Sequence, residues 1–130
     1  MKFSVNQQDL QKSLGYCQGV IEKRSTLPIL SNVLLEINSG HLTITATDLD
    51  LIFIHKTSNV EILEEGKTTT SSSIMYDIVR KISSGSKISF SNPSESKLQL
   101  ESEKSIFNLN CISASEFPLT DENFNQNEFS

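Results

Sequence analysis

The N-terminal part of the chain carries apolar residues at helical spacing. Between residues 6 and 22 they recur every three or four positions, at Leu10, Leu14, Cys17 and Ile21. Asn6 is a favourable N-cap, and Asp9 falls in the first turn, where a negative charge suits the helix dipole. The pattern predicts an amphipathic helix over residues 6–22 that buries one narrow stripe.

A second helical pattern covers residues 72–83. Its apolar stripe is formed by Ile74, Ile78 and Ile82, with Met75 and Val79 beside it. The pattern stops at Ser84-Gly85, where glycine disfavours a further helical turn. We therefore expect a second amphipathic helix in the middle of the chain.

Short alternating or β-branched runs predict strands around these helices. The runs are residues 2–5, 33–38, 41–47, 51–56, 59–63, 68–70, 87–91, 97–101 and 104–112. The pairs Ser39-Gly40, Asn92-Pro93 and Ser102-Glu103 predict turns between consecutive strands. The order of elements predicts an α+β fold in which two helices pack on one face of an antiparallel sheet.

Length and composition fit one soluble globular domain. The chain has 130 residues, of which 36% are hydrophobic and 21% charged. No apolar run approaches the roughly 20 residues of a membrane helix, and no apolar signal region follows Lys2. The two cysteines, Cys17 and Cys111, lack metal-type spacing. We expect a cytoplasmic protein with reduced thiols and without a metal or cofactor.

The last residues differ in character from the rest. From residue 119 the chain is polar and acidic, which is typical of a linker, and the final Glu128-Phe129-Ser130 echoes Lys2-Phe3-Ser4 near the start. We expect residues 1–118 to form the domain, and residues 119–130 to be a linker and the start of a second, truncated domain.

The charge is unevenly distributed. The net charge is −5, which by itself argues against nucleic-acid binding. However, residues 6–24 hold three basic and two acidic residues, and residues 73–83 hold two basic residues and one acidic residue. The remainder of the chain holds six basic and thirteen acidic residues. The predicted helices are therefore mildly basic and the strands and loops acidic, so that a polyanion would be attracted to the helices alone.

The polar helix faces are the candidate binding surface. Opposite the stripe of the first helix lie two lysines, two glycines and no carboxylate, at Gln8, Lys12, Gly15, Gly19 and Lys23. Each glycine costs a helix roughly 1 kcal/mol relative to alanine. This face is either an ordinary solvated surface of weak helix formers or one that another molecule approaches closely. The second helix presents Ser73, Tyr76 and Arg80 away from its stripe.

Signatures of catalysis are missing from the sequence. It has no glycine-rich phosphate loop, no Gly-x-Ser-x-Gly and no His-Glu-x-x-His. Asp48 and Asp50 form a carboxylate pair that a small hydrolase would use, but between two strands they are more typical of a turn. We expect a non-enzymatic protein.

Five blocks of sequence carry a resemblance to a known family. They are Met1-Lys2-Phe3-Ser4-Val5, residues 24–32 (Arg-Ser-Thr-Leu-Pro-Ile-Leu-Ser-Asn), Ala46-Thr47-Asp48-Leu49-Asp50, Tyr76-Asp77-Ile78-Val79-Arg80, and residues 105–109 leading to Ala114-Ser115-Glu116-Phe117-Pro118. In this order the blocks resemble the first domain of the bacterial DNA polymerase III beta subunit, the sliding clamp. The resemblance implies a protein of three similar domains that dimerises head to tail into a ring. Helices line the hole, sheets form the outside, and the ring tethers the polymerase to DNA as a non-catalytic subunit of the holoenzyme.

The resemblance also implies DNA-facing residues. Arg24 matches a DNA-contacting arginine of the family, and we extend the expected contact surface to Lys23, Lys12, Arg80 and Ser73. Members of the family often carry basic residues just before the second helix, where this chain has Ser71-Ser72-Ser73. Hydroxyl groups there would contact phosphate without releasing counterions.

A dimer contact is implied near the end of the domain. Residues 104–110 match the edge strand that pairs with the third domain of the other subunit, with Lys104, Ile106, Phe107 and Leu109 at the interface. Alternation places Phe107 and Leu109 on one face and Ile106 and Asn108 on the other, so only one pair can face a given partner.

The expected partners follow from the same resemblance. They are duplex DNA without sequence preference, a second copy of the protein, and the polymerase and clamp loader, which bind mainly through domains absent here. No membrane is involved. The alternative from another functional class is a stand-alone α+β interaction domain that oligomerises through its last edge strand.

Overall fold

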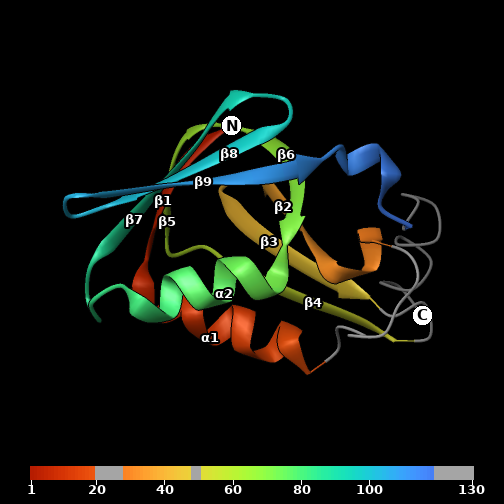
Figure 1. Cartoon of the computed structure of the whole chain (residues 1–130), viewed down its shortest axis with the longest axis horizontal. Helices are drawn as coiled ribbons and strands as arrows, with labels where there is room; N and C mark the ends of the chain where they lie inside the picture. The colour runs from red at the N-terminus through yellow and green to blue at the C-terminus, as the bar shows by residue number, and fades with distance from the viewer. Residues whose placement is uncertain (20–27, 48–50, 119–130) are drawn as a thin grey trace.

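The computed structural model describes residues 1–19, 28–47 and 51–118 (Figure 1). Two α-helices, α1 (Gln7–Gln18) and α2 (Ser72–Lys81), lie side by side against strands of antiparallel sheet. The strands are β1 (Lys2–Asn6), β2 (Asn32–Asn38), β3 (His41–Thr47), β4 (Ile52–Thr57), β5 (Val60–Glu64), β6 (Gly66–Ser71), β7 (Lys87–Ser94), β8 (Lys97–Ser102) and β9 (Ser105–Ile112). Short 3-10 turns, η1 (Pro28–Ser31) and η2 (Ala114–Glu116), precede β2 and follow β9. The predicted α+β architecture is confirmed.

The sheet is built from two similar halves that exchange strands. The strand order is β4-β3-β2-β6-β9-β8-β7-β1-β5, and every pairing is antiparallel. Each half of the chain runs strand, helix, three strands: β1-α1-β2-β3-β4 and then β6-α2-β7-β8-β9. However, β1 pairs with β7 of the second half, and β6 pairs with β2 of the first half. Among the described residues, the strands β4-β3-β2-β6 pair with the strands β9-β8-β7-β1-β5 only where Thr69 and Thr70 lie opposite Ile112 and Cys111.

Side-chain caps set the start of both helices. The Asn6 side chain accepts a hydrogen bond from the Gln8 amide at 2.8 Å, as predicted for an N-cap. Ser71 caps α2 in the same way, from the Ile74 amide. At the other end α1 stops at Gln18, where Gly19 closes the last turn, so the helix is shorter than predicted.

The inward face of α2 differs from the predicted stripe. Met75 and Val79 are fully buried, whereas Ile74 is 54% exposed. The buried face includes Ser72, whose hydroxyl donates to the Gln18 side chain of α1. The face bearing Ser72, Met75 and Val79 therefore points towards the interior, with the two apolar side chains in the core. The helix ends at Lys81, two residues early, because Ile82 turns to an extended conformation and packs on the core.

Two predicted turns lie elsewhere. Asn92 and Pro93 belong to β7, where the register shifts between Ser91 and Ser94. Such an irregularity accommodates a proline that cannot donate to the ladder. The chain turns instead at residues 95–96.

The last hairpin also turns later than predicted. Its turn lies at Glu103-Lys104, where Glu103 has a φ of +54°. Lys104 is therefore a turn residue and not the first residue of the last strand. The predicted turn at Asp48-Leu49-Asp50 lies outside the described residues.

The core lies between the helices and the sheet. It includes the predicted stripe residues Leu10, Leu14 and Cys17 of α1. Across β1 and β7, Phe3 and Phe90 are direct partners, and their rings stack with centroids 4.5 Å apart. Both rings are almost completely buried. This stacked pair joins the first strand of the chain to the core of the second half.

Cys17 gives a pH-dependent test of this core. Burial raises the pKa of its thiol from 9.0 to about 12. The folded protein keeps the proton while the unfolded chain releases it near pH 9, so the stabilising contribution is present below pH 9 and is lost as the pH rises towards 12. Between about pH 9.5 and 11, the free energy of unfolding of the wild type should fall by about 1.4 kcal/mol per pH unit more than that of Cys17→Ala. Urea unfolding at several pH values measures this difference, and equal slopes would contradict it.

Candidate nucleic-acid interface

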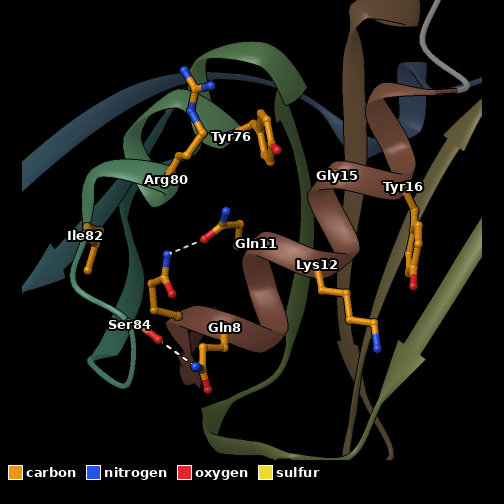
Figure 2. Close-up of a pocket in the computed structure, with 10 residues that line it drawn as sticks. Gln8, Gln11, Lys12, Gly15, Tyr16, Tyr76, Arg80, Ile82 and Ser84 are labelled. Carbon is orange, nitrogen blue, oxygen red and sulfur yellow. Dashed lines mark hydrogen bonds between the residues drawn. The ribbon is translucent and has the colours of Figure 1, made fainter.

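The outer surfaces of α1 and α2 enclose a shallow groove, here named the inter-helix groove. Its volume is about 700 Å³. It is lined by Gln7, Gln8, Gln11, Lys12, Gly15, Tyr16, Tyr76, Arg80, Ile82 and Ser84 (Figure 2). Three residues predicted as a polar helix face, Gln8, Lys12 and Gly15, therefore line one continuous surface. It also takes in two residues predicted on the second helix, Tyr76 and Arg80.

Glutamine side chains join the two helices beneath the groove. Gln7 is buried, and its Nε2 donates to the backbone oxygen of Val79 in α2 and to Gln11 Oε1, both at 2.8 Å. Gln8 Nε2 donates to the Ser84 hydroxyl beyond the end of α2. These bonds fix the spacing of the two helices, and so the spacing of the charged groups above them. Sequence reasoning missed Gln7, because a glutamine in the first turn of a helix, next to the apolar stripe, carries no sign of a cross-helix bond.

The two cations of the groove stand in different surroundings. Figure 2 shows Lys12 extending from α1 away from α2, whereas Arg80 extends from α2 on the other side. Among the described residues no carboxylate forms an ion pair with Lys12. Arg80 pairs with Asp77 at 3.1 Å, and its guanidinium carbon lies 5.5 Å from the centre of the Tyr76 ring. The cations are therefore spread across the helical layer, as several separate contacts to one polyanion would require.

Packing against α2 does not require a glycine at position 15. A Cβ built on Gly15 would lie 3.8 Å from Tyr76 Cε1 and from Tyr76 Oη, which is ordinary van der Waals contact. The packing within the domain therefore tolerates alanine at this position. Both sequence interpretations of the glycine face stay open, a weak solvated helix face or close approach by another molecule.

Of the remaining predicted DNA-facing residues, the structure describes only Ser73. Ser73 is exposed in the first turn of α2 and does not line it. Lys23 and Arg24 lie outside the described residues. On α1, the carboxylate of Asp9 accepts a hydrogen bond from Asn59, in the link between β4 and β5, at 2.7 Å. Asp9 is also absent from the groove lining.

The predicted interface strand, β9, has one open edge. Cys111 donates its backbone N–H to Ser96, which precedes β8, while the backbone oxygens of Asn110 and Ile112 accept from the threonine hydroxyls of β6. Backbone groups alternate in direction along a strand. The N–H and C=O groups of Ile106 and Asn108 therefore point away from β8, to a side where no described strand pairs with residues 105–110. We name this side the open edge of β9.

The side chains of β9 divide as the alternation predicts. Ile106 is 57% exposed, whereas Leu109 is buried in the core and Phe107 packs against the core while partly exposed. Lys104 lies in the turn that precedes the strand. Ile106 and the exposed part of Phe107 are thus available to a partner, and Leu109 supports the strand from within the domain.

The described residues contain no three His, Cys, Asp or Glu side chains placed to hold a metal ion. Asp48 and Asp50, the carboxylate pair of the hydrolase alternative, lie outside the described residues. Among the helices of the described chain, none has the length and apolar character needed to cross a membrane.

Comparison with known proteins identifies close relatives of the chain. The beta sliding clamp of Caulobacter vibrioides (strain NA1000 / CB15N) is 37% identical over 120 residues, which cover 92% of this chain and 32% of that protein. The beta sliding clamp of Escherichia coli K12 is 35% identical over 129 residues, which cover 99% of this chain and 35% of that protein. The chain thus spans about a third of the length of these relatives.

Solved structures share the fold. The structure of Caulobacter crescentus pol III beta matches with a TM-score of 0.87 and 36% identity, over 93% of this chain and 32% of that one. The DNA polymerase III subunit beta from Pseudomonas aeruginosa matches with a TM-score of 0.87 and 30% identity, over the same shares. The family described as DNA polymerase III beta subunit, N-terminal domain, matches residues 1–121. The predicted resemblance is confirmed, and the chain belongs to the DNA polymerase III beta subunit family.

Proposed function

We propose that this chain is the first domain of a sliding clamp, a non-catalytic processivity factor that encircles duplex DNA and tethers the replicative polymerase. The observation that carries the proposal is the inter-helix groove, where the cations Lys12 and Arg80 lie on the helical layer. In the proposed ring this layer lines the hole. The polymerase and the clamp loader bind mainly through the domains that follow this one, and the protein acts in the cytoplasm.

The distribution of charge supports this orientation. Among the described residues, the two helices carry three basic and two acidic side chains, and the rest carries six basic and eight acidic ones. Such an arrangement attracts the DNA backbone to the helices and not to the sheets. The contacts go to phosphate, which carries no sequence information, so the ring is free to move along the duplex.

The open edge of β9 supports head-to-tail dimerisation. Ile106 and Asn108 each offer a backbone donor and acceptor on this side, so a strand of another subunit can continue the sheet. On one face of the strand the exposed Ile106 adds apolar contact, Phe107 lies on the opposite face, and Lys104 lies at the rim. We propose that this edge pairs with the third domain of the second copy.

A topological experiment tests the proposed function. The full-length protein that contains this domain is loaded onto nicked circular duplex DNA by a clamp loader, and the DNA is then cut once. We expect the protein to stay on the circle and to leave after cutting, because a closed ring is held by encirclement and slides off free ends.

The control is the same complex on uncut circles at the same salt concentration. A protein that stays bound to the cut DNA, or that binds without a loader, is held by contact affinity. That outcome would contradict the ring and favour the stand-alone interaction domain.

A further inference from the structure

Asp77 and Arg80 form an exposed ion pair beside the inter-helix groove. They lie one turn apart on α2, with Arg80 Nη2 donating to Asp77 Oδ1 at 3.1 Å. Both side chains are more than half exposed, at 54% for Arg80 and 59% for Asp77. Water screens a pair of this kind, so it is weak enough to open when another anion competes for the guanidinium.

Tyr76 gives Arg80 a second support. The Arg80 guanidinium lies over the Tyr76 ring, and that ring lies in contact distance of the Gly15 position on α1. Figure 2 shows Tyr76 between Arg80 and Gly15. An arginine that leaves Asp77 therefore keeps a planar surface to rest on and stays at the groove.

Arg80 has a carboxylate partner on its own helix, and Lys12 has none among the described residues. Asp77 occupies Nη2 of Arg80 and places a negative charge beside any phosphate that Arg80 contacts. Arginine binds phosphate through two parallel hydrogen bonds and would otherwise be the stronger anchor of the two. A ring that slides is served by contacts that are individually weak.

We propose that Asp77 is a positioning residue that competes with DNA phosphate for Arg80 and so weakens the strongest contact of the groove. The inference rests on the proposed function, since it takes the groove to face DNA. In this role Asp77 does not touch DNA, but it sets how firmly this domain holds the DNA backbone and so how easily the domain moves along the duplex.

The test compares Asp77→Asn with the wild-type chain. Each protein is titrated with a short duplex at low salt, and binding is followed by fluorescence anisotropy and by the NMR signal of the Arg80 side-chain Nε–H. We expect Asp77→Asn to bind about two- to fivefold more tightly, the range spanned by exposed ion pairs. The slope of log K against log salt should steepen by up to about 0.9, the value for one further phosphate contact.

A double-mutant cycle separates this role from general repulsion. In an Arg80→Gln background, the gain from Asp77→Asn should vanish, because the arginine through which Asp77 acts is absent. Asp9→Asn is the matched control, since it removes the same charge from a helix but leaves Arg80 paired, and it should change affinity by less than about 1.5-fold.

The outcomes distinguish the two proposals. A gain that persists in the Arg80→Gln background, an equal gain from Asp9→Asn, or no gain at all overturns the role of Asp77. If Lys12→Gln and Arg80→Gln bind the duplex as well as the wild type does, the groove does not face DNA, and the proposed function itself fails.

Discussion

Replacing Phe90 with alanine is expected to lower the free energy of unfolding by about 3–5 kcal/mol. The Phe90 ring is 2% exposed and stacks on Phe3, which is 1% exposed, so truncation leaves a cavity that two paired strands cannot close. A domain of this size has a stability of about 5–15 kcal/mol, and the loss takes a large share of it. Urea unfolding followed by circular dichroism measures the change.

Leu63→Ala is the matched control. Leu63 is also a large apolar residue on a strand, but it is 78% exposed, so its truncation should change stability by less than about 0.5 kcal/mol. The double variant Phe3→Ala/Phe90→Ala should lose less than the sum of the single variants, by about 0.5–1.5 kcal/mol, because the ring stacking is removed only once. A loss below about 1 kcal/mol for Phe90→Ala would mean that the stacked pair is not central to the core.

The second large effect is expected at the open edge of β9. In the full-length protein, Asn108→Pro removes a backbone N–H that points away from β8, so pairing within the domain is kept while pairing with another subunit loses a donor. An unpaired carbonyl left in the interface costs about 2 kcal/mol, which raises the dimer Kd about thirtyfold. Analytical ultracentrifugation measures the Kd.

Asn108→Ala controls for the side chain. This variant loses the hydrogen bond from Gln99 Nε2 but keeps the backbone donor, so its dimer Kd should be close to that of the wild type. A thermal unfolding curve shows whether the proline variant remains folded. If a folded Asn108→Pro protein dimerises like the wild type, the dimer does not form through this edge.

Local patterns in the sequence were sufficient to predict the helices and most strands. The stripe of Leu10, Leu14, Cys17 and Ile21 has a single helical interpretation. Its first three residues are buried as predicted, and Ile21 lies outside the described residues. In α2, two sets of apolar residues have helical spacing, and either could form the buried face. One set is Met75 and Val79, and the other is the isoleucines at 74, 78 and 82. Met75 and Val79 are the pair that packs into the core, on the side where Ser72 and Gln7 form hydrogen bonds between the helices, and these contacts appear only once the helices pack.

In the candidate site, too, some features follow from local sequence and others depend on how the elements pack. The Asp77–Arg80 pair follows from a spacing of three residues on one helix, so the sequence already placed the two side chains near each other. The direction of the backbone groups of Ile106 and Asn108 depends on which side of β9 pairs with β8, and no pattern of side chains in one strand reveals that. Asn92-Pro93 was mistaken for a turn because a strand irregularity and a turn favour the same residues.

The exchange of β1 and β6 between the two halves has a consequence for synthesis. β1 leaves the ribosome first, but Phe3 must wait for Ile62 of β5 and then for Phe90 of β7. Until β5 has been translated, the nascent chain carries β1 without any strand partner, and its second partner follows only with β7. Such distant pairing slows folding, and it means that a chain arrested after its first half retains an exposed, aggregation-prone β1 that a chaperone would need to protect.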